Sequence, residues 1–298
     1  MMHENYYRTD LACEIRRSSD GEKEPGVCTR QRTQNGIEVL ETDIEPGEGE
    51  TRSGRAAGRY ITIFAGKFWL KGREEYDEIC GVLSDTLRQM TERTLPHKNR
   101  KELKILIAGL GNRFITSDAL GPLTVDRLIA TRHIRETNTR LFHLIGNCEI
   151  SLIAPGVIGQ TGFEAAEMIL GAAKCAEPDL ILAIDALAAR SCHRLGTTVQ
   201  LSNRGIMPGA GIGNHRQSID QETMGTPVFS LGIPTVVSSS ALILEAMEEA
   251  AVPDAGGDRL SRLLKSGESF FVSPKECDTV VAEGAKLFSD AIQSAFRL

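Results

Sequence analysis

The sequence predicts an α/β fold, a three-layer sandwich with a mostly parallel central sheet. Short apolar segments bounded by Gly, Pro or polar residues alternate along the chain with amphipathic segments of helical length. Strands and helices in alternation form parallel sheets with helices on both faces. The 298 residues, of which 41% are hydrophobic and 25% charged, are enough to enclose a sizeable core.

The N-terminal part shows little of this alternation. Residues 11–57 are rich in charge, Gly and Ser, so we expect a flexible, exposed segment that serves as a linker or lid. Residues 58–64 (GRYITIF) alternate like a strand and open the ordered domain, which we expect to span residues 58–298. Apolar residues from Tyr76 to Met90 then recur at helical spacing, and Pro96 ends that helix.

The rest of the chain supplies the remaining strands and helices of the predicted sheet. The predicted buried strands are 103–109, 140–146, 180–186 and 227–233. The predicted helices between and after them are 123–134, 163–176, 239–251 and 274–296.

Charge and cysteine usage exclude several classes of protein. The net charge is −6, from 34 basic and 40 acidic residues, so nonspecific attraction to nucleic acid or anionic lipid is not expected. The seven cysteines are odd in number and contain no CxxC pair, which indicates free thiols in a reducing compartment. The N-terminus lacks the apolar core of a signal peptide, and the apolar runs are far too short to span a membrane. We expect a cytoplasmic protein without membrane or direct nucleic-acid contact.

Two aspartates follow predicted strands. Asp118 lies after the Gly-rich turn that follows strand 103–109, and Asp185 lies at the end of the apolar run LILAID. Ligands of open α/β sheets bind beyond the carboxyl ends of the strands, so both carboxylates fall at the same edge. Two carboxylates that share a site can hold one proton between them, one acting as base toward water and the other as acid. The pair predicts hydrolysis without a protein nucleophile.

Structural explanations of the two aspartates remain open at this point. Asp118 could cap the following helix, and Asp185 could be a core carboxylate held by backbone N–H groups or by Arg190. Other chemistries have less support. The GLGNRF turn has Phe114 where a dinucleotide fingerprint has its third glycine, and the chain contains neither an HExxH zinc motif nor a GxSxG elbow.

A glycine-rich loop at residues 203–217 is a second candidate for contact with substrate. Gly209, Gly211 and Gly213 would let its backbone lie close to a bound peptide, although the loop could also be a long surface turn. Asn112, in the turn before Asp118, could hold water or substrate, or could simply form the turn.

Motifs spread from the N-terminus almost to the end of the chain resemble, in the same order, those of the germination protease family of endospore-forming bacteria. They are RTDLA (8–12), GRYITI (58–63), AGLGN (108–112), TSDALGP (116–122), APGVIGQTG (154–162), AIDALAARS (183–191), GIMPGAGIGN (205–214), GIPTVV (232–237) and FVSPKECD (271–278). Several of them are peculiar to that family.

The resemblance implies an endopeptidase of the aspartic A25 type that initiates degradation of small acid-soluble spore proteins in the spore core during germination. Its fold is then similar to that of the hydrogenase maturation endopeptidases. The catalytic residues implied are Asp118 and Asp185, without cofactor or metal. The family also implies a homotetramer, and a zymogen that removes its own propeptide. Here the propeptide would be residues 1–10, cut between Asp10 and Leu11.

The sequence departs from the family pattern beside these motifs. Ser117 replaces a proline, Asn203 and Arg204 replace an Asp-Thr pair, and Ala210 replaces a serine. Neither aspartate is affected. Two alternatives remain: a metal-dependent endopeptidase of the hydrogenase-maturation type, with the same carboxylates as ligands, and a protein that binds spore proteins without cutting them.

Overall fold

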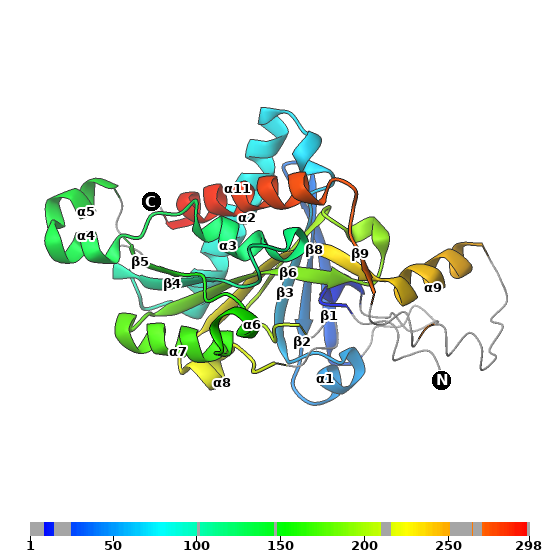
Figure 1. The fold of residues 1–298 in the computed structure, drawn as a ribbon, viewed down its shortest axis with the longest axis horizontal. Coiled ribbons are helices and arrows are strands. Elements are labelled where there is room, and N and C mark those ends of the chain that lie inside the picture. Colours follow the sequence, from blue (N-terminus) through cyan, green and yellow to red (C-terminus); the bar gives the residue numbers. More distant parts are fainter. Residues whose placement is uncertain are drawn as a thin grey trace.

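The computed structural model describes residues 9–14, 25–99, 102–145, 148–209, 216–250, 264 and 270–296. Within them nine strands form one sheet in the order β1-β2-β3-β7-β8-β6-β4-β5, with β9 paired to β8 (Figure 1). The strands are β1 (Val27–Gln34), β2 (Ile37–Ile44), β3 (Gly58–Phe64), β4 (Lys104–Gly109), β5 (Glu149–Ile153), β6 (Leu180–Ala189), β7 (Thr198–Ser202), β8 (Val228–Ser238) and β9 (Phe271–Val272).

Helices cover both faces of this sheet (Figure 1). The α-helices are α1 (Glu48–Ser53), α2 (Arg73–Thr94), α3 (Leu120–Val125), α4 (Arg132–Thr137), α5 (Thr139–Ile145), α6 (Ile158–Thr161), α7 (Ala165–Ala176), α8 (Gln221–Met224), α9 (Ser239–Glu249) and α11 (Cys277–Phe296). Short 3-10 helices are η2 (Ala12–Glu14), η3 (Phe68–Leu70), η5 (Thr116–Asp118) and η6 (Cys192–Arg194).

The α/β class and the central sheet are confirmed, and the sheet is mixed. Strands β8, β6, β4 and β5 run parallel to one another, as the alternation of strands and helices predicts. Strands β1, β2, β3 and β7 continue the sheet in antiparallel order. The predictions of β3, β4, β6, β8, α2, α7 and α9 were each correct to within a few residues.

Alternate side chains of the central strands face two separate cores. Ile105 and Ile107 of β4 pack with α2, α3 and α11 on one face. Leu106 and Ala108 pack with α7 on the other face. This alternation follows from the two-residue period of a strand and explains why the central strands are apolar throughout.

The prediction of a strand at residues 140–146 was wrong, because residues 140–145 belong to helix α5 and residue 146 lies outside the described residues. Only Phe142 of its side chains is buried, while Leu141 and Leu144 are exposed, so the run is one face of a surface helix. The strand that pairs with β4 on the side away from β6 is β5. The predicted helix 123–134 is likewise divided between α3 and α4.

The expectation of a flexible, exposed segment at residues 11–57 also needs correction. Strands β1 and β2 form an antiparallel hairpin, and β2 pairs with β3, so this part of the segment extends the sheet. The turn between them has positive φ at Asn35 (51°) and Gly36 (75°), as an Asn-Gly hairpin turn requires. The Asn-Gly pair was the signal in the sequence for this hairpin.

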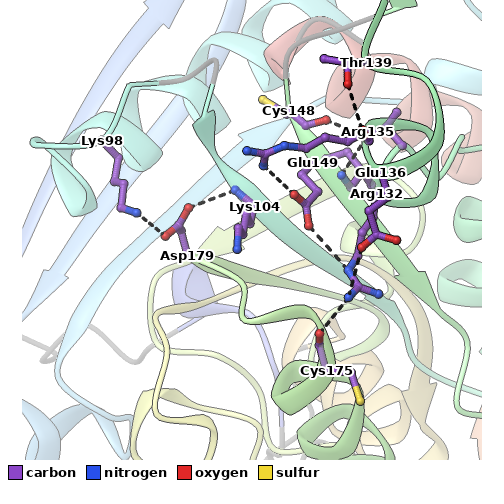
Figure 2. Close-up of polar contacts among 12 residues, drawn as sticks. Lys98, Lys104, Arg132, Arg135, Glu136, Thr139, Cys148, Glu149, Cys175 and Asp179 are labelled. Carbon is purple, nitrogen blue, oxygen red and sulfur yellow. Dashed lines mark hydrogen bonds and ion pairs between the residues drawn. The ribbon is translucent and has the colours of Figure 1, made fainter. Parts of the chain in front are cut away.

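The amino ends of the parallel strands are joined by ion pairs (Figure 2). Asp179, just before β6, accepts a hydrogen bond from the Lys104 backbone N–H (3.0 Å) and pairs with Lys98 (2.7 Å). Glu149, the first residue of β5, pairs with Arg135 (2.6 Å) and Arg132 (3.6 Å).

In the described part of the chain, no helix combines the length and apolarity needed to cross a membrane.

Candidate active site

The two aspartates predicted to be catalytic lie beyond the carboxyl ends of β4 and within β6. Asp185 is the sixth residue of β6 and is only 7% exposed. Asp118 is the last residue of η5, in the connection from β4 to α3. The Leu110 backbone N–H donates to the carbonyl of Ile184 (2.8 Å), and the Thr235 hydroxyl donates to the carbonyl of Ser117 (2.6 Å). The loop that carries Asp118 is therefore bonded both to the residue before Asp185 and to β8.

Two glycines make this close approach possible. Gly111 has φ +107°, and a Cβ atom there would lie 2.0 Å from the carbonyl oxygen of Asp118. A Cβ atom at Gly121 would lie 2.4 Å from Leu110 and 2.5 Å from the carbonyl of Ile184. Larger residues at either position would separate the Asp118 loop from β6.

Burial and like charge act together on these carboxylates. Desolvation raises the pKa of Asp185 well above its ordinary value, and the nearby carboxylates of Asp118 and Asp10 raise it further. Burial also raises the pKa of Asp118, opposed by its hydrogen bond from the Asn112 backbone N–H (2.7 Å) and by the charge of Arg216. A site of this kind favours one retained proton.

The structural explanations of the two aspartates are met only in part. Helix α3 is preceded by Ala119 and receives no side-chain capping bond, so Asp118 is not its N-cap. Asp185 accepts a hydrogen bond from the Ala186 backbone N–H (2.9 Å), whereas Arg190 forms an ion pair with Glu248 (3.6 Å).

The predicted processing site lies against the same end of β6. The Asp10 backbone N–H donates to the carbonyl of Ala188, and the Asp10 carboxylate accepts from the Ala188 backbone N–H, both at 2.8 Å. Leu11 is fully buried, in a cluster that includes Leu187 and Val237. Asp10 and Leu11 thus occupy the sheet edge that holds Asp185.

Two side chains that the sequence did not single out hold this segment. Arg55 donates to the carbonyls of Asp10 (Nη1, 3.1 Å), Thr9 (Nη2, 2.7 Å) and Leu11 (Nη2, 3.0 Å). Gln200 Nε2 donates to the carbonyl of Asp10 (2.6 Å). Gln200 could have been noticed as a polar residue within the apolar strand β7, but Arg55 lies in the segment expected to be flexible.

A cleft of about 390 Å³ lies at this position and includes Asp10 in its wall. The side chains of Arg55, Leu187 and Gln200 line it, together with the backbone of Gly232. Residues 205–207, at the start of the glycine-rich loop, form another part of its wall. The cleft therefore joins the docked segment to the loop that was predicted to contact substrate.

Of the four residues predicted to bind substrate, the structure describes Asn112 and Gly209. The Asn112 side-chain oxygen accepts hydrogen bonds from the Phe114 backbone N–H (3.0 Å) and from Gln160 (2.8 Å), so it joins the loop after β4 to helix α6. Gly209 has a positive φ of 76° in a turn. Gly211 and Gly213 lie outside the described residues.

The described residues contain one cluster of potential metal ligands, and it lies away from the two aspartates. Among the described residues, the one set of three His, Cys, Asp or Glu side chains with donor atoms within 4.8 Å of one another is Cys192, His193 and Glu245. It contains neither Asp118 nor Asp185. The donor set near the two aspartates is thus a poor match for a site built from three closely spaced ligands.

Comparison with known proteins identifies the family. The family model described as germination protease, Peptidase A25, matches residues 8–249. A germination protease of Caldanaerobacter subterraneus subsp. tengcongensis is 37% identical over 81% of this chain and 72% of the relative. Those of Clostridium acetobutylicum (32% identical, 98% of this chain and 96% of the relative) and Clostridium perfringens (34%, 97% and 95%) align over nearly their whole length. The chain therefore belongs to the germination protease family of peptidases.

Proposed function

We propose that this protein is an endopeptidase that initiates the degradation of small acid-soluble spore proteins in the spore core during germination, with Asp118 and Asp185 as an acid–base pair. The observation that carries the proposal is the placement of both carboxylates at the carboxyl ends of β4 and β6, where burial, and then the charge of Asp118, raises the pKa of Asp185. The family supports the protease activity. The mechanism and the substrate are inferred from the site together with the sequence motifs.

In the proposed mechanism the two carboxyl groups hold one proton between them. The ionised group removes a proton from water, and the water oxygen attacks the carbonyl carbon of the scissile peptide. The C–N bond of the resulting tetrahedral intermediate then breaks, and the protonated carboxyl group gives its proton to the leaving amine. The pair returns to its starting state of one proton.

We further propose that the chain is made as a zymogen whose propeptide, residues 1–10, is removed by cleavage between Asp10 and Leu11. The docking of Asp10 beside Asp185 supports this. The negative charge of Asp10 also raises the pKa of Asp185, so an acidic residue before the scissile bond would help to keep the shared proton. By the same reasoning we infer that spore-protein substrates are cut after an acidic residue that is followed by an apolar one.

Cleavage of a purified small acid-soluble spore protein tests the proposal. Wild type, Asp118→Asn and Asp185→Asn are compared, with a chelator added to a second wild-type sample and the N-terminus of each chain sequenced. Asp179→Asn is the matched control, because it makes the same substitution at the opposite edge of the sheet. We expect cleavage by wild type with or without chelator and by Asp179→Asn, no cleavage by Asp118→Asn or Asp185→Asn, and a new N-terminus at Leu11.

Other outcomes would contradict the proposal at separate points. Loss of wild-type cleavage in chelator would indicate that the aspartates are metal ligands. Full activity of either Asn variant would remove that residue from the mechanism, and binding of the spore protein without any cleavage would indicate a non-catalytic binder. An N-terminus other than Leu11 would contradict the processing site.

Assembly is a separate part of the proposal. We infer a homotetramer from the family resemblance alone. Sedimentation velocity on the full chain should give the mass of four copies, and a monomer at micromolar concentration would contradict this.

A further inference from the structure

Two side chains outside the proposed acid–base pair donate hydrogen bonds to the carbonyl oxygen of Asp10. Gln200 Nε2 donates at 2.6 Å and Arg55 Nη1 donates at 3.1 Å. If the chain is cut between Asp10 and Leu11, as proposed above, this is the carbonyl oxygen of the scissile peptide. It is the atom on which negative charge develops when water attacks.

The register of the sheet places Gln200 opposite Asp185 across a glycine. Gly232 of β8 pairs with Gln200 of β7 on one side and with Asp185 of β6 on the other. Directly paired residues of adjacent strands have side chains on the same face. The neighbours Val199 and Leu201 pack with α2 and α11, which confirms that Gln200 faces the opposite side of the sheet.

Gly232 places no side chain between those of Asp185 and Gln200. A Cβ atom there would lie 2.6 Å from both the Asp185 carbonyl oxygen and Leu187 Cγ. Adjacent strands are about 4.8 Å apart, so Asp185 and Gln200 are separated by roughly 10 Å, about the width that an extended segment lying between them needs. Gly232 itself lines the cleft that contains Asp10.

The same two side chains also fix the orientation of the peptide. Arg55 Nη2 donates to the carbonyls of Thr9 and Leu11, on either side of the Asp10 carbonyl. Gln200 Oε1 accepts from the Ala12 backbone N–H (2.5 Å). Every one of these bonds is made to the backbone, so another peptide of different sequence could form them in the same way.

We propose that Arg55 and Gln200 form the oxyanion site of this peptidase. Attack of water moves the π electrons of the Asp10 carbonyl onto its oxygen, and the proton lost by water passes to the ionised carboxylate of the aspartate pair. The two N–H donors stabilise the oxyanion until the electrons return, the C–N bond breaks and the Leu11 nitrogen takes the proton from the carboxyl group. Arg55 contributes a positive charge as well as a hydrogen bond, which strengthens its interaction with the oxyanion.

The test measures cleavage and docking of the segment in the same full-length proteins. Gln200→Met removes the amide donor at nearly constant length, and Arg55→Lys keeps the charge but removes the planar pair of donors. Removal of one oxyanion donor lowers kcat by about 10²–10³-fold in proteases. The rate constant of cleavage at Asp10–Leu11 is followed by mass spectrometry, and the docking of residues 9–14 is followed by hydrogen exchange.

We expect each variant to cut about 10²–10³-fold more slowly while the exchange protection of residues 9–14 falls much less than the rate. Arg59→Gln is the control, because Arg59 is a cation of the neighbouring strand that pairs with Asp43 (2.7 Å) and should leave the rate unchanged. Wild-type rates in both variants would overturn the proposal. A fall in rate that only matches the loss of protection would also overturn it, because the two residues would then be anchors for the segment.

Asp185→Asn, measured in parallel, separates this inference from the proposed function. If Asp185→Asn is inactive and the Arg55 and Gln200 variants cut at the wild-type rate, the oxyanion site is wrong and the aspartate mechanism stands. If Asp185→Asn cuts normally, the aspartate mechanism is wrong.

Discussion

At the amino ends of the parallel strands Glu149 and Asp179 are paired with cations, whereas at the carboxyl ends Asp185 interacts electrostatically with the carboxylates of Asp118 and Asp10. The two edges bury their carboxylates to the same degree, since Glu149 is 9% exposed and Asp185 is 7% exposed. Arg132 and Arg135 contact Glu149 (Figure 2). At Asp185 the neighbouring charges that raise the pKa are carboxylates.

The difference between the edges indicates what each carboxylate does. A buried charge is costly unless it is paired, and the cations at the amino ends of the strands supply that pairing. Asp185 instead has a pKa raised well above its ordinary value, which is costly for stability but suits a group that must exchange a proton. The amino ends of the parallel strands, here called the amino edge, stabilise the fold. Their carboxyl ends, the carboxyl edge, carry the proposed chemistry.

The largest effect should come from neutralising one carboxylate at each edge and comparing activities. Asp185→Asn should lower the rate of peptide cleavage by about 10²–10⁴-fold, the usual contribution of a general acid or base. Glu149→Gln should leave the rate within about twofold of wild type, measured at a temperature at which both variants are folded. Equal losses at the two edges would show that Asp185 acts only through stability.

Neutralising Glu149, which should leave the cleavage rate nearly unchanged, should lower stability. Glu149→Gln removes the charge that pairs with Arg135 at 2.6 Å, and it should lower the free energy of unfolding by about 1–3 kcal/mol at pH 7. Urea unfolding checks this. Glu136→Gln is the control, because Glu136 is exposed and its pair with Arg132 is long (3.7 Å). A Glu149 variant as stable as the Glu136 variant would contradict the stabilising role of the amino edge.

The smallest effect should come from replacing Arg132, which forms the longer of the two ion pairs of Glu149. Arg132→Gln leaves Arg135 in place, so Glu149 keeps a cation and the free energy of unfolding should fall by less than about 1 kcal/mol. A larger loss than that of Glu149→Gln would show that Arg132 acts mainly through its bond to the Cys175 carbonyl (3.0 Å).

Much of the sheet could be predicted because its central strands are apolar on both faces. Residues 103–109 and 180–186 contain little except buried side chains, and the rule that ligands lie beyond the carboxyl ends then predicted one edge for Asp118 and Asp185. The strand predicted at residues 140–146 was wrong because a seven-residue apolar run is compatible both with a buried strand and with one face of a surface helix.

The contacts of Arg55 could not be predicted in the same way. Its partners, the carbonyls of Thr9, Asp10 and Leu11, lie more than 40 residues away in sequence. They are backbone groups, so no side-chain pattern marks them. Only the docking of residues 9–14 onto the sheet edge brings Arg55 to the site.

The central claim is that the carboxyl edge holds Asp185 with a raised pKa for use in catalysis. A carboxyl group with a folded-state pKa above its unfolded value of 3.8 stabilises the fold while protonated, and this stabilisation is lost as the pH rises through the folded pKa. Asn at this position cannot ionise. The stability of Asp185→Asn relative to wild type should therefore increase with pH.

The most direct measurement is the free energy of urea unfolding of wild type and Asp185→Asn from pH 4 to pH 8, on chains whose intact N-terminus is verified by mass. We predict that the difference in favour of Asp185→Asn is smallest at pH 4, grows as the pH rises, and becomes constant above the folded pKa. A difference that does not change with pH, or that favours wild type increasingly at high pH, would contradict the account.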